Sequence, residues 1–167
     1  RAMVVGGSAA PRSMIEGFQQ RHGLRIVHAW GMTEMSPMGT IANVPSRLAD
    51  ASEDEIYSYR STQGSPAPFV EVRGRNEEGL IPWDNEAMGE LEVRGVWIAP
   101  SYYESPEGAG SFTEDGWFKT GDIVKISPYG SIHLQDRAKD VIKSGGEWIS
   151  SVALENALIG HPAVAEA

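Results

Sequence analysis

The chain has 167 residues, of which 41% are hydrophobic and 22% are charged, and its formal net charge is -9 at pH 7. This length is sufficient for one hydrophobic core or for two small ones, and the composition is ordinary for a globular protein. The acidic balance argues against a nucleic-acid partner, whose phosphates require a basic face, and the absence of cysteine excludes disulfide bonds and thiolate metal sites.

The sequence contains no segment typical of membrane insertion or secretion. No apolar run approaches the ~20 residues of a bilayer-spanning helix, and the charged and apolar regions of a signal peptide are missing. The absence of cysteine fits a reducing, cytoplasmic location. The chain begins at Arg1 rather than at methionine, and residues 161–167 resemble the start of a further element, so we interpret both ends as cut from a longer protein.

Residues 1–30 predict a strand, a helix and a second strand. The apolar run Met3–Val5 indicates a buried strand, Pro11 suits the first turn of a helix because proline has no N–H to satisfy there, and Leu24–Trp30 indicates the next strand. Such a βαβ unit makes the two strands parallel and places both following loops at the sheet edge where ligands bind. The helix is expected to show an apolar face and a terminal glycine: Met14, Ile15, Phe18 and Gly23.

The middle of the chain changes from an irregular to an alternating pattern. Residues 43–68 are polar and predict a long surface connection with one helical turn near Ala49–Ile56. From Phe69 onward the hydrophobic period is two, which is typical of half-buried strands. We therefore predict a small, mostly antiparallel β-subdomain with barrel-like closure, whose last hairpin turns at Ser127–Gly130. Residues 151–159 then predict a helix.

The stretch Phe118–Glu147 stands out because every lysine of this acidic chain lies in it: Lys119, Lys125, Lys139 and Lys143. A local cationic island beside glycine-rich turns and a fixed carboxylate suits a polyanionic small ligand. The alternative is that these lysines only decorate an exposed hairpin and a linker.

Two short segments carry candidate nucleotide ligands. The aromatic ring, glycine, hydroxyl and carboxylate of Trp30–Glu34 could stack a base and hold a metal–phosphate, although Thr33 and Glu34 also form an ordinary helix start. Asp122 follows a glycine in what we expect to be a tight turn, where its carboxylate could accept both hydroxyls of a ribose. It could equally close its own turn.

Other chemistries find little support in the residues. The histidines share no metal-ligand spacing, and His28 and His133 are expected to be strand residues: His22, His28, His133 and His161. Neither a Gly-x-Ser-x-Gly elbow nor a Gly-x-x-x-x-Gly-Lys-Ser/Thr loop occurs. We interpret Trp97, Tyr102 and Tyr103 as packing residues rather than as a stacking platform.

The Thr-Gly-Asp motif ending at Asp122, preceded by an aromatic pair, is followed by the pattern Asp-Arg-x-Lys-Asp-x-Ile-Lys-x-Gly-Gly-Glu in residues 136–147. Together these motifs resemble the adenylate-forming family, which includes acyl-CoA synthetases, firefly luciferase and peptide-synthetase adenylation domains. The resemblance covers the whole chain and is closest to fatty-acid–CoA ligases. Gly89-Glu90-Leu91 resembles a structural motif of the same family.

The resemblance implies roles for individual residues. Asp122 would bind the ribose hydroxyls, Arg137 would support ribose or phosphate, and Lys139 would lie at the hinge between two domains. Lys143 would be catalytic and, with Trp148, would approach the adenylate only when the C-terminal part swings in. The adenine pocket would be lined by Gly7, Ser8, Ala9, Trp30 and Gly31. Thr33 and Glu34 would be catalytic: Thr33 would contact the α-phosphate, and Glu34 would contact phosphate and hold Mg²⁺. Gly145 and Gly146 would border the pantetheine channel.

The fold class expected is α/β, in three parts. Residues 1–44 would end a parallel α/β adenine-binding subdomain, residues 45–136 would form a connection and the β-subdomain, and residues 137–167 would form the hinge and the start of a C-terminal α+β domain. The family usually has tyrosine where this chain has Trp30, which keeps a stacking plane but loses the hydroxyl. The family's phosphate loop and C-terminal catalytic lysine are not found in this chain.

The function implied is ATP-dependent formation of an acyl-adenylate followed by thioester formation with coenzyme A. The ligands would be ATP or AMP, Mg²⁺, a fatty acid and coenzyme A, with no nucleic acid, and the complete enzyme could form a homodimer. A ligase for another carboxylate and a synthetase that loads a carrier protein are alternatives within the family. A nucleotide-binding domain without catalysis and a purely structural fragment are alternatives of other classes.

Overall fold

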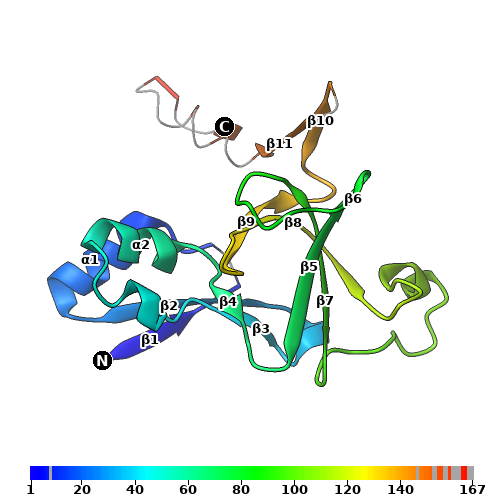
Figure 1. The fold of residues 1–167 in the computed structure, drawn as a ribbon, viewed down its shortest axis with the longest axis horizontal. Helices are drawn as coiled ribbons and strands as arrows, with labels where there is room; N and C mark the ends of the chain where they lie inside the picture. The colour runs from blue at the N-terminus through cyan, green and yellow to red at the C-terminus, as the bar shows by residue number, and fades with distance from the viewer. Residues whose placement is uncertain (8, 146, 152–153, 156–157, 159–162, 165–167) are drawn as a thin grey trace.

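A computed structural model describes residues 1–7, 9–145, 147–151, 154–155, 158 and 163–164 (Figure 1). Its strands form a four-stranded sheet in the order β1-β2-β3-β4, a five-stranded sheet in the order β6-β5-β7-β8-β9, and a separate hairpin, β10-β11. The two sheets lie side by side, and the helices α1 and α2 cover one side of the first sheet (Figure 1). The mixed α/β class predicted from the sequence is confirmed.

The first sheet begins with the predicted βαβ unit. β1 (Ala2–Val5) pairs in parallel with β2 (Arg25–Gly31), and α1 (Arg12–His22) connects them. Gly23 ends α1 with a φ of 60°, the left-handed conformation that glycine adopts without strain, and Ile15 is fully buried beneath the helix. The expectation of a buried first strand is wrong, because β1 is an edge strand of the described sheet and Val4 is 60% exposed.

The segment after β2 contains more regular structure than its composition suggests. A 3₁₀ turn (η1, Thr33–Met35) leads into β3 (Met38–Ile41), which pairs antiparallel with β2 and with β4 (Ser65–Pro66). The sheet is therefore mixed rather than parallel throughout.

The connection predicted to hold one helical turn holds a full helix. After a 3₁₀ turn (η2, Ser46–Leu48), α2 runs over Glu53–Ser61 and packs beside α1. Ser52 caps it: its hydroxyl accepts from the Glu55 N–H, and the Glu55 carboxylate accepts from the Ser52 N–H. This reciprocal capping box was readable as Ser-x-x-Glu, so the single-turn prediction missed an available signal.

The five-stranded sheet is antiparallel, as predicted, with β5 (Val70–Asn76), β6 (Gly79–Leu80), β7 (Gly89–Gly95), β8 (Phe118–Ile126) and β9 (Ile132–Arg137). A further 3₁₀ segment, η3 (Glu107–Ser111), precedes β8. Apolar side chains of alternate positions fill the core on one face: Val70, Val72, Leu91, Val93, Phe118, Val124, Ile126 and Ile132.

The predicted barrel-like closure is wrong. Among the described strands β6 and β9 are the two edges of the sheet and do not pair with each other. The edge of β9 is instead occupied by the connection from the first sheet: the Gln63 N–H donates to the Ile132 carbonyl at 3.0 Å, and the Ile132 N–H donates to the Gly64 carbonyl at 2.8 Å. The first sheet thus takes the place that a closing strand would need.

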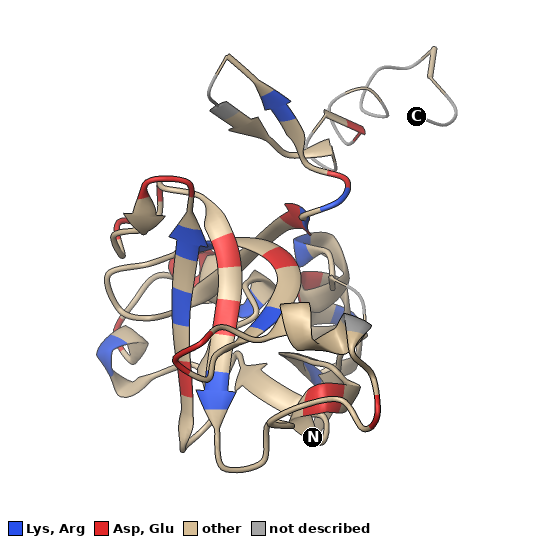
Figure 2. Ribbon diagram, turned by 90° about the vertical axis from the view of Figure 1, so that its right-hand side faces the viewer, with Lys and Arg blue, Asp and Glu red and all other residues tan. Residues whose placement is uncertain are grey.

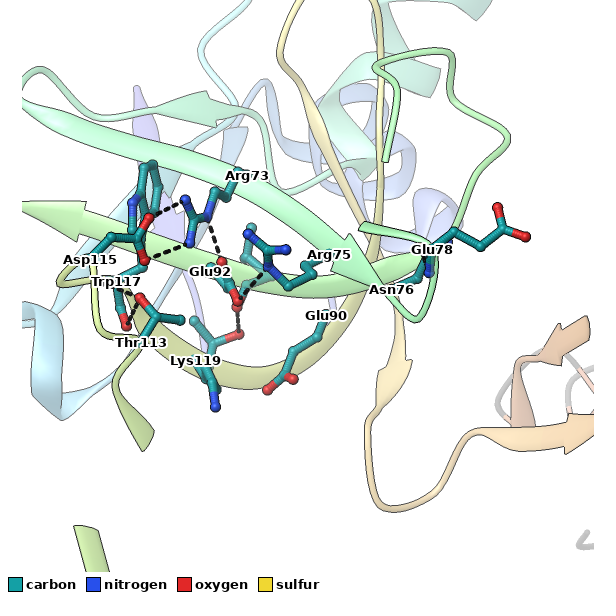
Figure 3. Close-up of polar contacts among 12 residues, drawn as sticks. Arg73, Arg75, Asn76, Glu78, Glu90, Glu92, Thr113, Asp115, Trp117 and Lys119 are labelled. Carbon is teal, nitrogen blue, oxygen red and sulfur yellow. Dashed lines mark hydrogen bonds and ion pairs between the residues drawn. The ribbon is translucent and has the colours of Figure 1, made fainter. Parts of the chain in front are cut away.

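The other face of this sheet carries an ion-pair network. In the pairing of β5 with β7, Glu71 lies opposite Arg94, and Arg73 lies opposite Glu92. Figure 2 shows these acidic and basic positions facing each other across the two strands. Figure 3 shows Arg73 between the buried Glu92 and the exposed Asp115, to which it donates at 2.8 and 3.1 Å, with its guanidinium 4.2 Å from the Trp117 ring centroid. This network braces β5, β7 and the approach to β8.

The C-terminal hairpin stands apart from both sheets (Figure 1). β10 (Ile142–Ser144) and β11 (Glu147–Ile149) pair antiparallel around Gly145, whose φ is 61°. Ser151, Leu154, Glu155 and Leu158 are helical, and the rest of the helix predicted for residues 151–159 lies outside the described residues. No helix among the described residues has the length and apolar character needed to cross a membrane.

Candidate nucleotide-binding site

The candidate site lies where the end of β2 meets β8 and β9. The Trp30 indole Nε1 donates to Asp122 Oδ2 at 2.9 Å, joining side chains 92 residues apart in the chain. Arg137, at the end of β9, pairs through Nη1 with Asp122 Oδ1 at 2.9 Å. The Asp122 carboxylate is therefore held between Trp30 of the first sheet and Arg137, which belongs to the same sheet as Asp122.

Asp122 lies within a strand rather than in the tight turn expected from its sequence. Gly121 has a φ of 72°, and the pairing of β8 shifts register on both of its sides, which marks a bulge. The Gly121 N–H donates to Glu90 Oε1 at 3.2 Å, and the Asp122 N–H donates to Thr120 Oγ1 at 3.1 Å. Asp122 at this bulge is buried, like Thr120 and Val124 on either side of it in β8.

Glu90 was not identified as a site residue from the sequence. It belongs to the Gly-Glu-Leu motif, which suggested a structural role, and the structure gives that role a specific form. By accepting the Gly121 N–H, the Glu90 carboxylate holds the bulge that carries Asp122.

The Asp122 carboxylate is buried, with 4% of the residue exposed. Burial raises the pKa of Asp122 above its ordinary value of 3.8, while the charge of Arg137 and the hydrogen bond from Trp30 act in the opposite direction. A carboxylate can accept about four hydrogen bonds, and Trp30 and Arg137 supply one to each oxygen. The remaining lone pairs suit two further donors, such as the adjacent hydroxyls of a ribose.

A cavity of about 130 Å³ collects six of the predicted site residues: Gly7, Ala9, Trp30, Gly31, Asp122 and Arg137. A second hollow of about 420 Å³ shares Gly7, Trp30 and Gly31 with the first and is also lined by Thr33. The glycine loop, the aromatic-glycine edge and the Thr-Gly-Asp motif therefore lie together, as the sequence motifs predict.

His28 also lines this cavity. Its position within a strand was predicted correctly, but its place in the site wall was not. Nε2 accepts from the Ala10 N–H at 3.4 Å, and the buried Nδ1 has no hydrogen-bond partner within the described part of the chain. No local pattern in the sequence identifies this residue.

Glu34 lies in the 3₁₀ turn after β2 and is half buried. Its Oε1 accepts a hydrogen bond from the Tyr102 hydroxyl at 2.6 Å, which raises the pKa of Tyr102. No group of three or more histidine, aspartate or glutamate side chains that could hold a metal occurs among the described residues. A single carboxylate still fits Mg²⁺, which keeps several waters and binds through one or two carboxylates together with phosphates.

Lys143 and Trp148 do not line the cavity around Asp122, whereas Lys139 lines a neighbouring hollow of about 690 Å³ together with Ala9, Asp122 and Arg137. The Lys143 ammonium pairs with Glu77 Oε1 at 3.0 Å and lies 4.6 Å from the Trp148 ring centroid. Lys139 lies in the exposed turn after β9, in which the N–H groups of Asp140 and Val141 both donate to the Arg137 carbonyl. Gly145 is at the hairpin turn, and Ser8 and Gly146 lie outside the described residues.

This arrangement places a glycine loop, an aromatic ring and a buried carboxylate around one cavity between two sheets, and the comparisons with known proteins give the family of the chain. Residues 1–103 match the family described as AMP-binding enzyme, and the chain belongs to this family. The resemblance found in the sequence motifs is thereby confirmed.

Individual relatives narrow the comparison. The chain is 48% identical over 167 residues to a medium-chain-fatty-acid–CoA ligase of Ectopseudomonas oleovorans, covering 99% of this chain and 30% of that protein. It is 48% identical over 169 residues to a long-chain-fatty-acid–CoA ligase of Thermus thermophilus, covering 100% and 31%. Its structure matches o-succinylbenzoate coenzyme A synthetase of Bacillus subtilis in complex with ATP and magnesium ion, with a TM-score of 0.77, 28% identity and coverage of 99% and 32%. The chain thus spans about a third of the length of these relatives.

Proposed function

We propose that this chain is the adenylate-binding segment of a fatty-acid–CoA ligase. The observation that carries the proposal is the buried Asp122 carboxylate, which Trp30 and Arg137 hold at the edge of a cavity lined by the family's motif residues. The 48% identity to two fatty-acid–CoA ligases along the whole chain supports a fatty acid as the carboxylate substrate.

The reaction proposed has two steps. A fatty-acid carboxylate attacks the α-phosphorus of ATP to give an acyl-adenylate and pyrophosphate, and the thiol of coenzyme A then displaces AMP to give the thioester. The protein contributes mainly by positioning the reactants and by stabilising charge that develops on phosphate oxygens. Mg²⁺, when bound beside Glu34, would neutralise charge on the outer phosphates.

Several residues of the cavity and of the hollow beside it have a proposed task in the first step. The Trp30 ring and the glycine loop around Gly7 and Ala9 bound the adenine, and Asp122 accepts the ribose hydroxyls. Arg137 sits 2.9 Å from Asp122 and is half exposed, so its free donors can reach ribose or phosphate. Thr33, which lines the neighbouring hollow, would contact the α-phosphate.

The C-terminal residues have a proposed task after a domain movement. Lys139 lies in the turn between β9 and the hairpin, where a hinge would change the position of Lys143, Trp148 and the Gly145 turn together. The proposed parts are residues 1–44, 45–136 and 137–167. This division is supported by the position of the hairpin, which contacts the β5-β6 turn through the Lys143–Glu77 pair rather than the nucleotide cavity.

The proposal extends to the setting of the complete enzyme. ATP, a fatty acid and coenzyme A are the substrates, and the cytoplasm, where ATP and coenzyme A meet, is the proposed location. A homodimer is also proposed, and light scattering of the complete enzyme would test it.

The test of function uses the complete ligase with ATP, Mg²⁺ and fatty acids of increasing chain length. Pyrophosphate release without coenzyme A should report the first step, and thioester formation on adding coenzyme A should report the second. The Asp122→Ala variant of the complete enzyme is the control for the site. Failure of every fatty acid to release pyrophosphate, while another carboxylate succeeds, would show a ligase of different specificity. AMP binding without any turnover would show a nucleotide-binding protein instead.

A further inference from the structure

We propose that Tyr102 is a positioning residue that holds the Glu34 carboxylate for the metal–triphosphate part of ATP. The inference rests on the proposed function, since it assumes that Glu34 faces a metal-bound nucleotide. It assigns a task to a tyrosine whose sequence context indicated only packing.

The contact between the two side chains is short and charge-assisted. The Tyr102 hydroxyl lies 2.6 Å from Glu34 Oε1, within the range of about 2.5–2.7 Å that is typical of a hydroxyl donating to a carboxylate. Tyrosine can donate one hydrogen bond, and this one is directed to Glu34. The second oxygen of Glu34 makes no hydrogen bond within the described part of the chain, so one oxygen is fixed by protein and the other is available to a ligand.

The Tyr102 ring is itself held in place by aromatic neighbours. Its centroid lies 5.9 Å from that of Phe112 and 6.4 Å from that of Phe118, both in edge-on geometry. A Cβ built on Gly108 would lie 2.5 Å from Tyr102 Cδ2, so only glycine leaves room for the ring at this point. Because the ring has little freedom, the hydroxyl presents a fixed donor to Glu34.

The same segment also holds the backbone of Glu34. The Ala99 N–H donates to the Glu34 carbonyl at 2.8 Å. Glu34 is therefore fixed at two atoms by residues that lie between β7 and β8, in addition to its place in the 3₁₀ turn. A purely apolar packing role for Tyr102 would not require the hydroxyl contact.

The aromatic contacts connect Glu34 to the ribose side of the site. Phe118 is buried, with 3% of its surface exposed, and it begins β8, the strand that also carries Asp122. Tyr102 thus contacts both β8, the strand that carries Asp122, and Glu34 in the η1 turn. This geometry would set the distance between the two ends of a bound nucleotide.

Removal of the hydroxyl should therefore affect metal-bound ATP and spare AMP. Partners that orient a metal-facing carboxylate typically contribute about 10–100-fold to metal affinity or activity when they are replaced. We expect Tyr102→Phe to weaken binding of Mg·ATP by about 10-fold, because Glu34 keeps its charge but loses its orientation. AMP, which lacks the outer phosphates, should bind unchanged.

The experiment is calorimetry on the complete ligase without a fatty acid, so that no reaction follows binding. The affinities for ATP with Mg²⁺, ATP with EDTA, and AMP are measured for wild type and for Tyr102→Phe. Tyr103→Phe is the matched control, because Tyr103 is 89% exposed and makes no hydrogen bond within the described residues. The gain in ATP affinity on adding Mg²⁺ should shrink in Tyr102→Phe and stay at the wild-type value in Tyr103→Phe.

A double-mutant cycle separates an effect through Glu34 from a general loss of packing. If Tyr102 acts through Glu34, Tyr102→Phe should add nothing to Glu34→Gln in the Mg²⁺-dependent gain. Additive losses, equal losses for AMP and Mg·ATP, or an unchanged Mg²⁺-dependent gain in Tyr102→Phe would each overturn the inference. Failure of the proposed function itself looks different, since wild type would then show no Mg²⁺-dependent gain at all.

Discussion

Replacement of Asp122 by alanine tests the centre of the candidate site. The carboxylate accepts from Trp30 and Arg137, and two of its acceptor positions remain for the ribose hydroxyls. A hydrogen bond to a charged group contributes about 1.5–3 kcal/mol. With about 1.4 kcal/mol for each factor of ten, loss of one such bond corresponds to about 12- to 140-fold in affinity. Asp122→Ala in the complete ligase should weaken AMP binding by at least the lower value.

The assay compares AMP with 2′,3′-dideoxy-AMP by calorimetry. Wild type should prefer AMP strongly, and Asp122→Ala should bind both ligands with similar, weak affinity, because neither ligand then has a carboxylate partner. Glu71→Ala is the matched control, since Glu71 is an exposed carboxylate paired with Arg94 at 2.7 Å on the opposite face of the sheet. Its AMP affinity should equal that of wild type.

The refuting result is an equal loss for the two nucleotides. In that case Asp122 would act through the fold, by holding Trp30 and Arg137, and not through the ribose. Thermal unfolding of the variant without ligand separates these roles further. A melting temperature that stays at the wild-type value would exclude a role through the fold, and a lower one would measure the contribution of the buried Trp30–Asp122 bond.

Further predictions concern the metal, the hinge, the pH dependence and the isolated chain. Glu34→Gln in the complete ligase should slow pyrophosphate release and raise the Mg²⁺ concentration needed for half-maximal rate, and an unchanged Mg²⁺ requirement would leave Glu34 as a helix-start residue. Lys139→Pro should slow one half-reaction much more than the other, because proline fixes φ at a proposed hinge, and a proportional loss of both rates would indicate misfolding. AMP affinity should fall on acidification at a pH above 3.8, where Asp122 with its raised pKa takes up a proton. Because the folded state raises the pKa of Asp122, the protonated side chain stabilises the fold below pH 3.8, and this stabilisation is lost as the pH rises through the raised pKa. The contribution of Asp122 to the melting temperature without ligand should therefore increase on acidification, while the affinity for AMP decreases. The isolated 167-residue chain should release pyrophosphate no faster than a control without protein, because the family's phosphate loop and C-terminal catalytic lysine are not found in it. Each missing electrostatic contact lowers the rate by a factor of about 10²–10³. Turnover that Asp122→Ala abolishes would contradict this.

Local sequence patterns were sufficient for the parts of the fold that local forces determine. The βαβ unit follows from apolar periodicity and from Gly23, and the strands β5, β7 and β9 follow from alternation. The capping box at Ser52 was equally local and would have predicted α2. The short strands β3 and β4 could not be predicted, because four and two residues carry too little pattern and their pairing depends on β2.

The site divides in the same way. Motifs placed Trp30, Asp122 and Arg137 at one ligand, but no pattern could show that the indole itself bonds the carboxylate across 92 residues. Tyr102 and Glu90 reach the site from other strands and loops, and their partners are set by the register of the folded sheet. Contacts of this kind depend on tertiary structure, and the sequence around either residue is compatible with simple packing.

The bond between Trp30 and Asp122 also has a consequence for how the two sheets separate during unfolding. β2 belongs to one sheet and β8 to the other, and this buried bond is one of the links between them. A nucleotide that touches both residues would act as a reversible cross-link, and its binding energy would be added to the energy needed to separate the sheets. Amide hydrogens of β2 and β8 would then become slower to exchange together, although they lie in different sheets. A bound nucleotide would then help to make the two sheets behave as one unit.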